Sequence, residues 1–364
     1  MYTASWKTLL SAGLALNAAA SPIFKFHNTG LHKRAPAIAT AFELASGVAS
    51  DCGANAATLQ TWFDESLTMA DTALNAMDRA EQDGEIRRVL SNLFGIQFGA
   101  NGQPTNPENF LVVQEFLTAI RDFINSGSSP NLSQKTQLFC GSQWMTPVAW
   151  DSDLIGGDGQ PVIDHSVNPA EPYHVDEEIT FASAKADGLT PYRVLTSANP
   201  ANLPQVSAYI FDNSYTAGQY GGTYCDGTNS LGATYDGLRH LHQDFPDIIT
   251  LCPLAFTKPQ YNNVLGDAPR ANRNVAASLP KSSTLFHEMI HLVKGVSETD
   301  DFNFYSVSKC TNDARHNNGD TARGAPECYV YFATAMYYRM TGDNTGQHWS
   351  WASGRGLPVG PPPP

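Results

Sequence analysis

The chain has 364 residues, of which 42% are hydrophobic and 16% are charged. This length and composition exclude an intrinsically disordered chain and allow a sizeable apolar core. The 22 lysines and arginines and 35 aspartates and glutamates give a net charge of −13, which argues against a nucleic acid or an anionic membrane as partner.

The first 34 residues carry the features of a secretory leader and a short propeptide. Lys7 precedes the apolar run LLSAGLALNAAA, which is too short to span a bilayer and ends in small residues near Ala20. We expect a signal peptide over 1–20, a propeptide over 21–34 that ends at Lys33-Arg34, and a secreted protein. A buried N-terminal helix is the alternative for the apolar run.

Apolar residues at helical spacing predict an amphipathic helix from Ala54 to about Gln82. Further predicted elements follow in chain order: helices over Glu85–Phe94 and Asn109–Ile124, a strand TQLFC ending at Cys140, strands VSAYIFD and IITLCPLAF, and helices over Ser282–Lys294 and Pro326–Met340. Residues 151–204 are rich in Gly, Pro and Asp, and we interpret them as a surface insertion rather than a second core. The order of elements indicates an α+β fold, mostly helical with a small sheet.

The domain organisation that follows is a single domain over 35–350. Residues 351–364 end in GRGLPVGPPPP, and this proline-rich tail is expected to be disordered.

Six cysteines lie beyond the dibasic pair, and an even number in a secreted chain favours disulfides. They are Cys52, Cys140, Cys225, Cys252, Cys310 and Cys328. No two of them form a C-x-x-C pair, which argues against a cysteine zinc site. Spacing alone does not choose among the fifteen possible connectivities.

Other polar residues give weaker signals. Asn131 begins an N-glycosylation sequon, NLS. His240 and His242 suit a strand face or a surface metal contact, although solvated surface histidines are the simpler interpretation. Tyr215 lies in a Gly-rich and Tyr-rich stretch and is a candidate to face a substrate.

The stretch STLFHEMIHLVKG places His287 and His291 four residues apart, with Glu288 directly after the first. On a helix such residues differ by about 40° around the axis and about 6 Å along it, so both imidazoles can face one metal ion. Glu288 would then point to the side and hold a water. Chance gives about 0.01 occurrences of this H-E-x-x-H pattern in a chain of this composition, which favours a catalytic zinc helix over coincidence.

Catalytic zinc needs a third protein ligand and one open position. A metzincin would have Gly and His where this chain has Lys294 and Ser297. A gluzincin would use a downstream glutamate; Glu298 is too close on the same run, and Glu327 remains possible. An aspartate in the turn after the helix is the third option.

That turn, SETDDFNFYS, resembles the Gly-Thr-x-Asp-Tyr-x-Tyr-Gly signature of the aspzincins, the deuterolysin and fungal lysine-specific metallo-endopeptidase family. Further stretches are similar to this family: DCGANAATLQTWFDESL and RRVLSNLFG to its first two helices, ITLCPLAF to the strand before the zinc helix, and APECYVYFATA to its Asn-Ala-Asp-x-Tyr-x-x-Phe-Ala stretch. The resemblance covers about 51–340.

The resemblance implies a zincin-like fold and a fungal, secreted zinc endopeptidase. His287, His291 and Asp301 would hold one Zn²⁺ per chain. Glu288 would be the general base that activates a metal-bound water, and Glu327 would support a ligand or that water. The implied disulfides are Cys52–Cys140, Cys225–Cys252 and Cys310–Cys328. Protein or peptide substrates and a monomer are expected.

This chain departs from the family pattern at three places. Glu298 replaces the glycine before the threonine, so the turn must be built differently. Phe304 replaces the tyrosine that would stabilise the oxyanion, and the neighbouring Tyr305 is a candidate substitute or substrate contact. Val330 replaces the acidic residue of lysine-specific members, which argues against lysine specificity.

The alternative function is a zinc-binding secreted or surface protein without effective catalysis, for zinc scavenging or host interaction. Related zinc-scavenging antigens replace the glutamate with arginine. Glu288 favours the enzyme, because a protein that only binds zinc needs no base at that position.

Overall fold

The structure, a computed structural model, describes residues 34–48, 50–132, 134–156, 159–195, 207–212, 225, 230–235, 246–295, 298–299, 301 and 304–363. The α-helices in these ranges are α1 (Ala56–Asp78), α2 (Gly84–Phe94), α3 (Pro107–Ser126), α4 (Ala182–Ala186), α5 (Pro253–Thr257), α6 (Ser283–Lys294), α7 (Val307–His316) and α8 (Pro326–Met340). Short 3-10 helices are η1 (Ile38–Thr40), η2 (Gly53–Asn55), η3 (Val175–Glu177), η4 (Ile179–Phe181), η6 (Val275–Ser278) and η7 (Ala322–Gly324).

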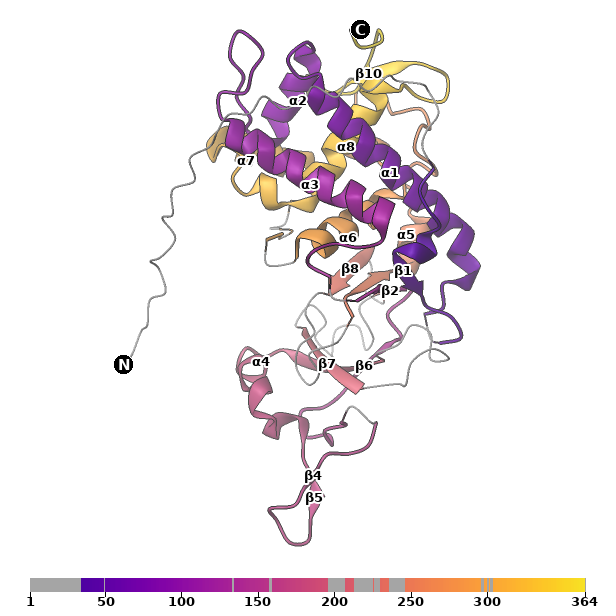
Figure 1. Ribbon diagram of the computed structural model, residues 1–364, viewed down its shortest axis with the longest axis vertical. Helices are drawn as coiled ribbons and strands as arrows, with labels where there is room; N and C mark the ends of the chain where they lie inside the picture. Colours follow the sequence, from indigo (N-terminus) through magenta and orange to yellow (C-terminus); the bar gives the residue numbers. More distant parts are fainter. Residues whose placement is uncertain are drawn as a thin grey trace, which may run out of the picture. The chain divides into compact units, whose positions relative to one another are not determined.

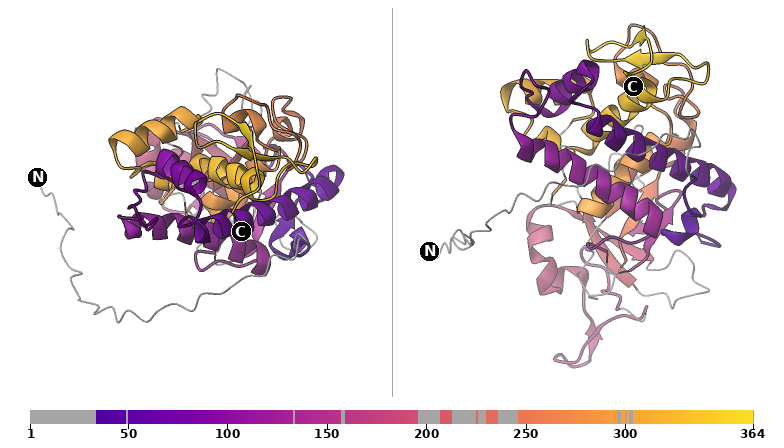
Figure 2. Two further views of the ribbon diagram at one scale, coloured as in Figure 1. Left: turned by 90° about the horizontal axis from the view of Figure 1, so that it is seen from above. Right: turned by 45° about the horizontal axis from the view of Figure 1, so that its top comes forward.

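The helices α1, α2, α3, α6 and α8 surround one apolar core. Figures 1 and 2 show α1 and α3 side by side, and α1 also packs along α8. The ends of α2 follow from its sequence: the Asp83 side chain accepts a hydrogen bond from the Glu85 N–H, and Gly95 adopts a φ of 68° that ends the helix. The predicted helices over 54–82, 85–94, 109–124, 282–294 and 326–340 are thus present within a few residues of the expected bounds.

A four-stranded sheet lies against α6. Its order is β1 (Phe42–Leu44), β2 (Thr136–Phe139), β9 (Ile248–Leu251) and β8 (Gly232–Tyr235). The first three strands are parallel, whereas β8 runs antiparallel to β9 at the edge. The expected strands TQLFC and IITLCPLAF correspond to β2 and β9, and the latter stretch continues into α5. The molecule is therefore α+β.

Residues 151–204 contribute to a second sheet and to a small apolar core. A second antiparallel sheet joins β3 (Met145–Pro147), β6 (Thr190–Leu195) and β7 (Ser207–Asp212), and a hairpin joins β4 (Ile163–Asp164) to β5 (Glu171–Pro172). Leu154, Val175, Phe181 and Tyr209 form a small separate core. The expectation that this segment has no core of its own is wrong, because its scattered apolar residues meet around β7.

The expectation of a disordered tail is also wrong over Leu357–Val359. This segment forms β11, which pairs antiparallel with β10 (His348–Ser350). The side chains of Arg339 and Gln347 donate to the carbonyls of Gly360 and Val359 at 2.8 and 2.9 Å. These donors satisfy carbonyl groups of the proline-rich segment and hold it against the molecule.

Three disulfides are present: Cys52–Cys140, Cys225–Cys252 and Cys310–Cys328. These are the pairs that the resemblance implies. None of the helices in the described ranges is both long enough and apolar enough to cross a bilayer.

Candidate metal centre

Helix α6 places His287 and His291 on one side, one turn apart. Every residue from Ser283 to Val293 is buried, because α6 contacts α8, α3, α1 and β8. Both histidines are 8% exposed, and their ring centroids lie 5.0 Å apart. The sequence thus positions two imidazoles at one buried point.

Asp301 joins them from the turn that follows α6. Gly295 ends the helix with a φ of 84°, a conformation that favours glycine, and the Thr299 N–H bonds back to the Gly295 carbonyl at 3.1 Å. Asp301 Oδ1 then lies 3.1 Å from His287 Nε2 and 3.2 Å from His291 Nε2. One candidate ligand atom from each of the three residues lies within 4.8 Å of the others.

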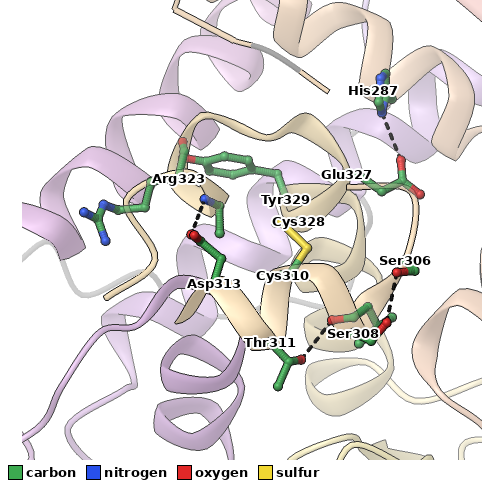
Figure 3. Close-up of a disulfide and its surroundings, with 12 residues drawn as sticks. His287, Ser306, Ser308, Cys310, Thr311, Asp313, Arg323, Glu327, Cys328 and Tyr329 are labelled. Atoms are coloured by element: carbon green, nitrogen blue, oxygen red, sulfur yellow. Dashed lines mark hydrogen bonds and ion pairs between the residues drawn. A yellow bond between two sulfur atoms is a disulfide. The ribbon is translucent and has the colours of Figure 1, made fainter. Parts of the chain in front are cut away.

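Hydrogen bonds to the other ring nitrogens assign the histidine tautomers. The Thr299 hydroxyl donates to the Gly295 carbonyl at 2.8 Å, so its oxygen accepts from His291 Nδ1–H, also at 2.8 Å. The Glu327 carboxylate accepts from His287 Nδ1–H at 3.0 Å (Figure 3). With the Nδ1 protons in place, both Nε2 lone pairs of neutral rings face Asp301 Oδ1.

Three electron pairs that converge at about 3 Å repel one another unless a cation lies among them. The pKa shifts of His287 and Asp301 also indicate that a positive charge is favoured between them. Burial favours neutral His287. In the absence of a metal, however, a proton on Nε2 would bond Asp301, and this bond together with that to Glu327 raises the His287 pKa well above its ordinary value. Burial likewise opposes the charge of Asp301, yet hydrogen bonds with the two histidines lower its pKa far below normal. One metal cation would satisfy all three groups together.

Glu288 is held between α6 and the edge strand β8. It is 5% exposed, and its Oε2 accepts from the Thr234 hydroxyl at 2.9 Å. A Cβ atom on Gly232 would lie 2.8 Å from Glu288 Oε1, so only glycine lets β8 approach this closely. Burial raises the pKa of Glu288. The carboxylate is therefore fixed in orientation beside the histidines.

Tyr305 contacts Asp301 rather than standing apart as a free donor. Its hydroxyl donates to Asp301 Oδ2, while the residue as a whole is 63% exposed. Phe304, in contrast, is 7% exposed and lies in the core. Tyr305 thus occupies one of the two carboxylate oxygens of Asp301, the candidate third ligand, and fixes the orientation of this carboxylate.

Glu327 lies at the start of α8, next to a disulfide. Figure 3 shows the Cys310–Cys328 bridge between α7 and α8, with Glu327 reaching from α8 to His287. The Tyr329 hydroxyl donates to the Arg323 carbonyl at 2.7 Å and further fixes the first turn of α8. These links hold the carboxylate that orients His287.

Sequence patterns did not reveal Thr234 and Gly232, because a threonine and a glycine on a short strand carry no metal signal. Thr299 matches the threonine of the family signature, and the structure shows its hydroxyl oxygen bonded to His291 Nδ1. The Asn131 side chain is exposed and donates to the Val293 carbonyl at 2.8 Å. Tyr215, His240 and His242 lie outside the described residues.

Comparisons of the chain with protein-family models, with curated proteins and with solved structures found no match.

Proposed function

We propose that this protein is a secreted zinc-dependent endopeptidase with a zincin-like catalytic domain, similar to the aspzincins. The observation that carries the proposal is the convergence of His287 Nε2, His291 Nε2 and Asp301 Oδ1, with both Nδ1 atoms engaged elsewhere. Two imidazoles and one carboxylate form a donor set that zinc prefers, and three protein ligands leave a fourth position for catalysis.

Each residue of the site has a role in peptide hydrolysis. When bound, zinc supplies a Lewis acid that polarises a carbonyl and lowers the pKa of a water to about 7. Glu288 takes the proton of the attacking water and delivers it to the leaving amine. Thr234 keeps the Glu288 carboxylate aimed at that position, since its hydroxyl is bonded to Oε2.

The secreted part of the proposal is supported by the three disulfides, because such bonds persist in oxidising compartments. The apolar run before Ser21 in the sequence agrees with export.

One observation favours the alternative of a zinc-binding protein without hydrolysis. Phe304 has no donor for an oxyanion, and the Tyr305 hydroxyl is engaged by Asp301. A peptidase must then use another donor or release Tyr305 from Asp301 during the reaction.

The test compares Glu288→Gln with the wild type in zinc content and in hydrolysis of denatured casein. We expect one zinc per chain in both and a loss of hydrolysis of about 100- to 10,000-fold in the variant. Glu298→Gln is the matched control, because Glu298 is exposed and pairs only with Lys294 at 3.7 Å within the described ranges. Undiminished hydrolysis by Glu288→Gln would overturn the assignment, and zinc binding without hydrolysis by the wild type would establish the alternative.

A further inference from the structure

The segment directly after Arg34 is bonded to helix α1. The Ala35 N–H donates to Asp64 Oδ1 at 3.1 Å, and the Gln60 side-chain amide donates to the Pro36 carbonyl at the same distance. Ala35 is only 6% exposed. The backbone nitrogen of Ala35 therefore lies in a partly buried place and faces a carboxylate.

The same segment continues into the main sheet. After η1 it forms β1, which pairs parallel with β2. Phe42 of β1 is fully buried, and its ring packs edge-on against Phe63 and Phe123. The chain thus belongs to the folded domain from Ala35 onward, and the dibasic pair Lys33-Arg34 lies directly before it in the sequence.

Asp64 has a cation as partner, and this cation belongs to the residue before Ala35. Arg34 Nε lies 3.5 Å from Asp64 Oδ2; the Arg34 side chain is 80% exposed and that of Asp64 is 29% exposed. Asp64 Oδ1 also accepts from the Gln60 amide at 3.1 Å. Within the described ranges no other lysine or arginine pairs with Asp64, so a cut after Arg34 would remove the cation.

We propose that the bond between Arg34 and Ala35 is a processing site and that Asp64 binds the new N-terminus. In a protease that recognises paired basic residues, water adds across this peptide bond. The Arg34 carbonyl becomes a carboxylate, and the Ala35 nitrogen becomes an ammonium group. The nitrogen that donates to Asp64 as a neutral amide then donates as a cation, which strengthens the hydrogen bond and replaces the charge of Arg34.

The position of the cut decides whether this ion pair forms. One extra residue before Ala35 would leave an amide at this nitrogen and move the ammonium group about 3.5 Å along the chain. Only a chain that begins at Ala35 therefore places its terminal charge on Asp64. This inference is independent of the proposed peptidase function, because neither Ala35 nor Asp64 belongs to the candidate metal centre.

The first arm of the experiment determines where the secreted chain begins. The full chain is expressed in a secreting host whose proteases cut after paired basic residues, and mass spectrometry of the purified protein identifies its first residue. We expect Ala35 as the first residue of the wild type, and an uncut bond in Arg34→Gln. A wild-type chain that begins at any other residue would overturn the inference.

The second arm measures the reactivity of the Ala35 amine. Cyanate reacts with the neutral form of an amine, and a carboxylate partner makes this form about tenfold rarer because it favours the ammonium form. Processed Asp64→Asn should therefore react about tenfold faster than the processed wild type. Asp122→Asn is the matched control, since the Asp122 side chain is 62% exposed on α3 and pairs with Arg121. Equal rates in the wild type and Asp64→Asn would contradict the ion pair.

Thermal unfolding separates the ion pair from the hydrogen bond, because asparagine still accepts from the Ala35 nitrogen. Asp64→Asn should lower the melting temperature of the processed chain about 2 °C more than that of the uncut Arg34→Gln chain, which has no charge at residue 34 or at the Ala35 nitrogen. Equal losses in both chains would overturn the inference.

A measurement on the wild type alone applies where Asp64→Asn does not accumulate. The Ala35 amine of the processed chain should react with cyanate about tenfold more slowly in the folded protein than in guanidinium chloride. Equal rates in the two conditions would show that Asp64 does not hold the N-terminus.

Discussion

The Nδ1 hydrogen bonds of His287 and His291 determine which ring nitrogen can bind a metal. Glu327 accepts from one ring and Thr299 from the other. Partners of this kind fix the ring orientation and the tautomer of metal-binding histidines. At the residue scale, the site therefore depends on these two acceptors as well as on the ligands.

Thr299→Val tests this dependence, because valine has the shape of threonine without the hydroxyl. Thr299 is 2% exposed, so in the valine variant water cannot take the place of the lost hydroxyl as acceptor for His291 Nδ1–H. We expect zinc affinity to fall about 10- to 100-fold, measured against a competing chelator. Thr299→Ser keeps the hydroxyl and should keep the affinity; equal affinity in both variants would contradict the role given to Thr299.

The sequence located the histidines, Glu288, Asp301 and Glu327, and the structure brings all of them to one place. The helical period explains the first three. The residue pattern left Glu327 and an aspartate in the turn open as third ligands, and the family resemblance then favoured Asp301 as the ligand and gave Glu327 a supporting role. Tyr305 was one candidate for an oxyanion donor or a substrate contact; its bond to Asp301 was not predicted, because the path of the turn after Gly295 is not readable from residue types. Thr234 was missed because its role depends on the pairing of β8 with β9.

At the scale of elements, the close contact of β8 with α6 positions the base. Gly232→Ala would place a methyl group 2.8 Å from Glu288 Oε1 and displace the carboxylate. A displacement of about 1 Å should lower hydrolysis about 100-fold, with zinc affinity unchanged. Gly84→Ala is the control, since its Cβ would meet the Arg87 side chain at an ordinary 3.6 Å. Undiminished hydrolysis by Gly232→Ala would show that the Glu288 carboxylate does not depend on the close approach of β8.

A half-buried carboxyl on α1, that of Glu65, gives the fold a pH dependence. Glu65 Oε1 accepts from the Leu265 N–H at 3.0 Å. Burial raises the pKa of Glu65, and the Leu265 N–H that donates to its carboxylate offsets this rise only in part. Because the folded state holds the proton more tightly than the unfolded state, this group favours folding below its unfolded pKa, and that contribution is lost as pH rises through the folded pKa.

Glu65→Gln is therefore expected to raise the melting temperature at pH 7 and to have little effect near about pH 3, where the carboxyl is protonated in both states. Thermal unfolding of both proteins across this range provides the measurement. Glu81→Gln is the control, since Glu81 is exposed. A stabilisation that stays constant with pH would exclude Glu65 as its source.

The elements themselves were predictable where apolar spacing was long and regular, as in α1 and α3. Apolar spacing does not predict helix α7, because its residues are mostly polar. The Cys310–Cys328 bridge connects it to α8. The β10–β11 hairpin was missed because its partners, Arg339 and Gln347, lie outside the proline-rich tail. The sequence of a single segment does not reveal which residues elsewhere in the chain it will contact.

At the scale of the whole molecule, the candidate metal centre joins helices that are separate in the sequence and packed together in the fold. The candidate ligands come from α6 and the turn after it, and Glu327 links them to α8 and, through Cys310–Cys328, to α7. A bound cation would stabilise all of these segments together, because it binds the folded chain only.

Removal of zinc by a chelator should therefore lower the free energy of unfolding by about 4 kcal/mol when free zinc is about 1,000 times its dissociation constant. Calorimetry with and without zinc checks this. Asp301→Asn, which loses the charged ligand, should show a much smaller difference. Identical unfolding of the wild-type protein in both conditions would argue against a structural link through the metal.

Anomalous diffraction at the zinc absorption edge tests the central claim most directly. We predict one peak per chain, about 2.0–2.2 Å from His287 Nε2, His291 Nε2 and an oxygen of Asp301, in tetrahedral arrangement. A crystal grown with zinc that shows no peak among these three side chains, or shows Asp301 turned away from the metal, would contradict the account.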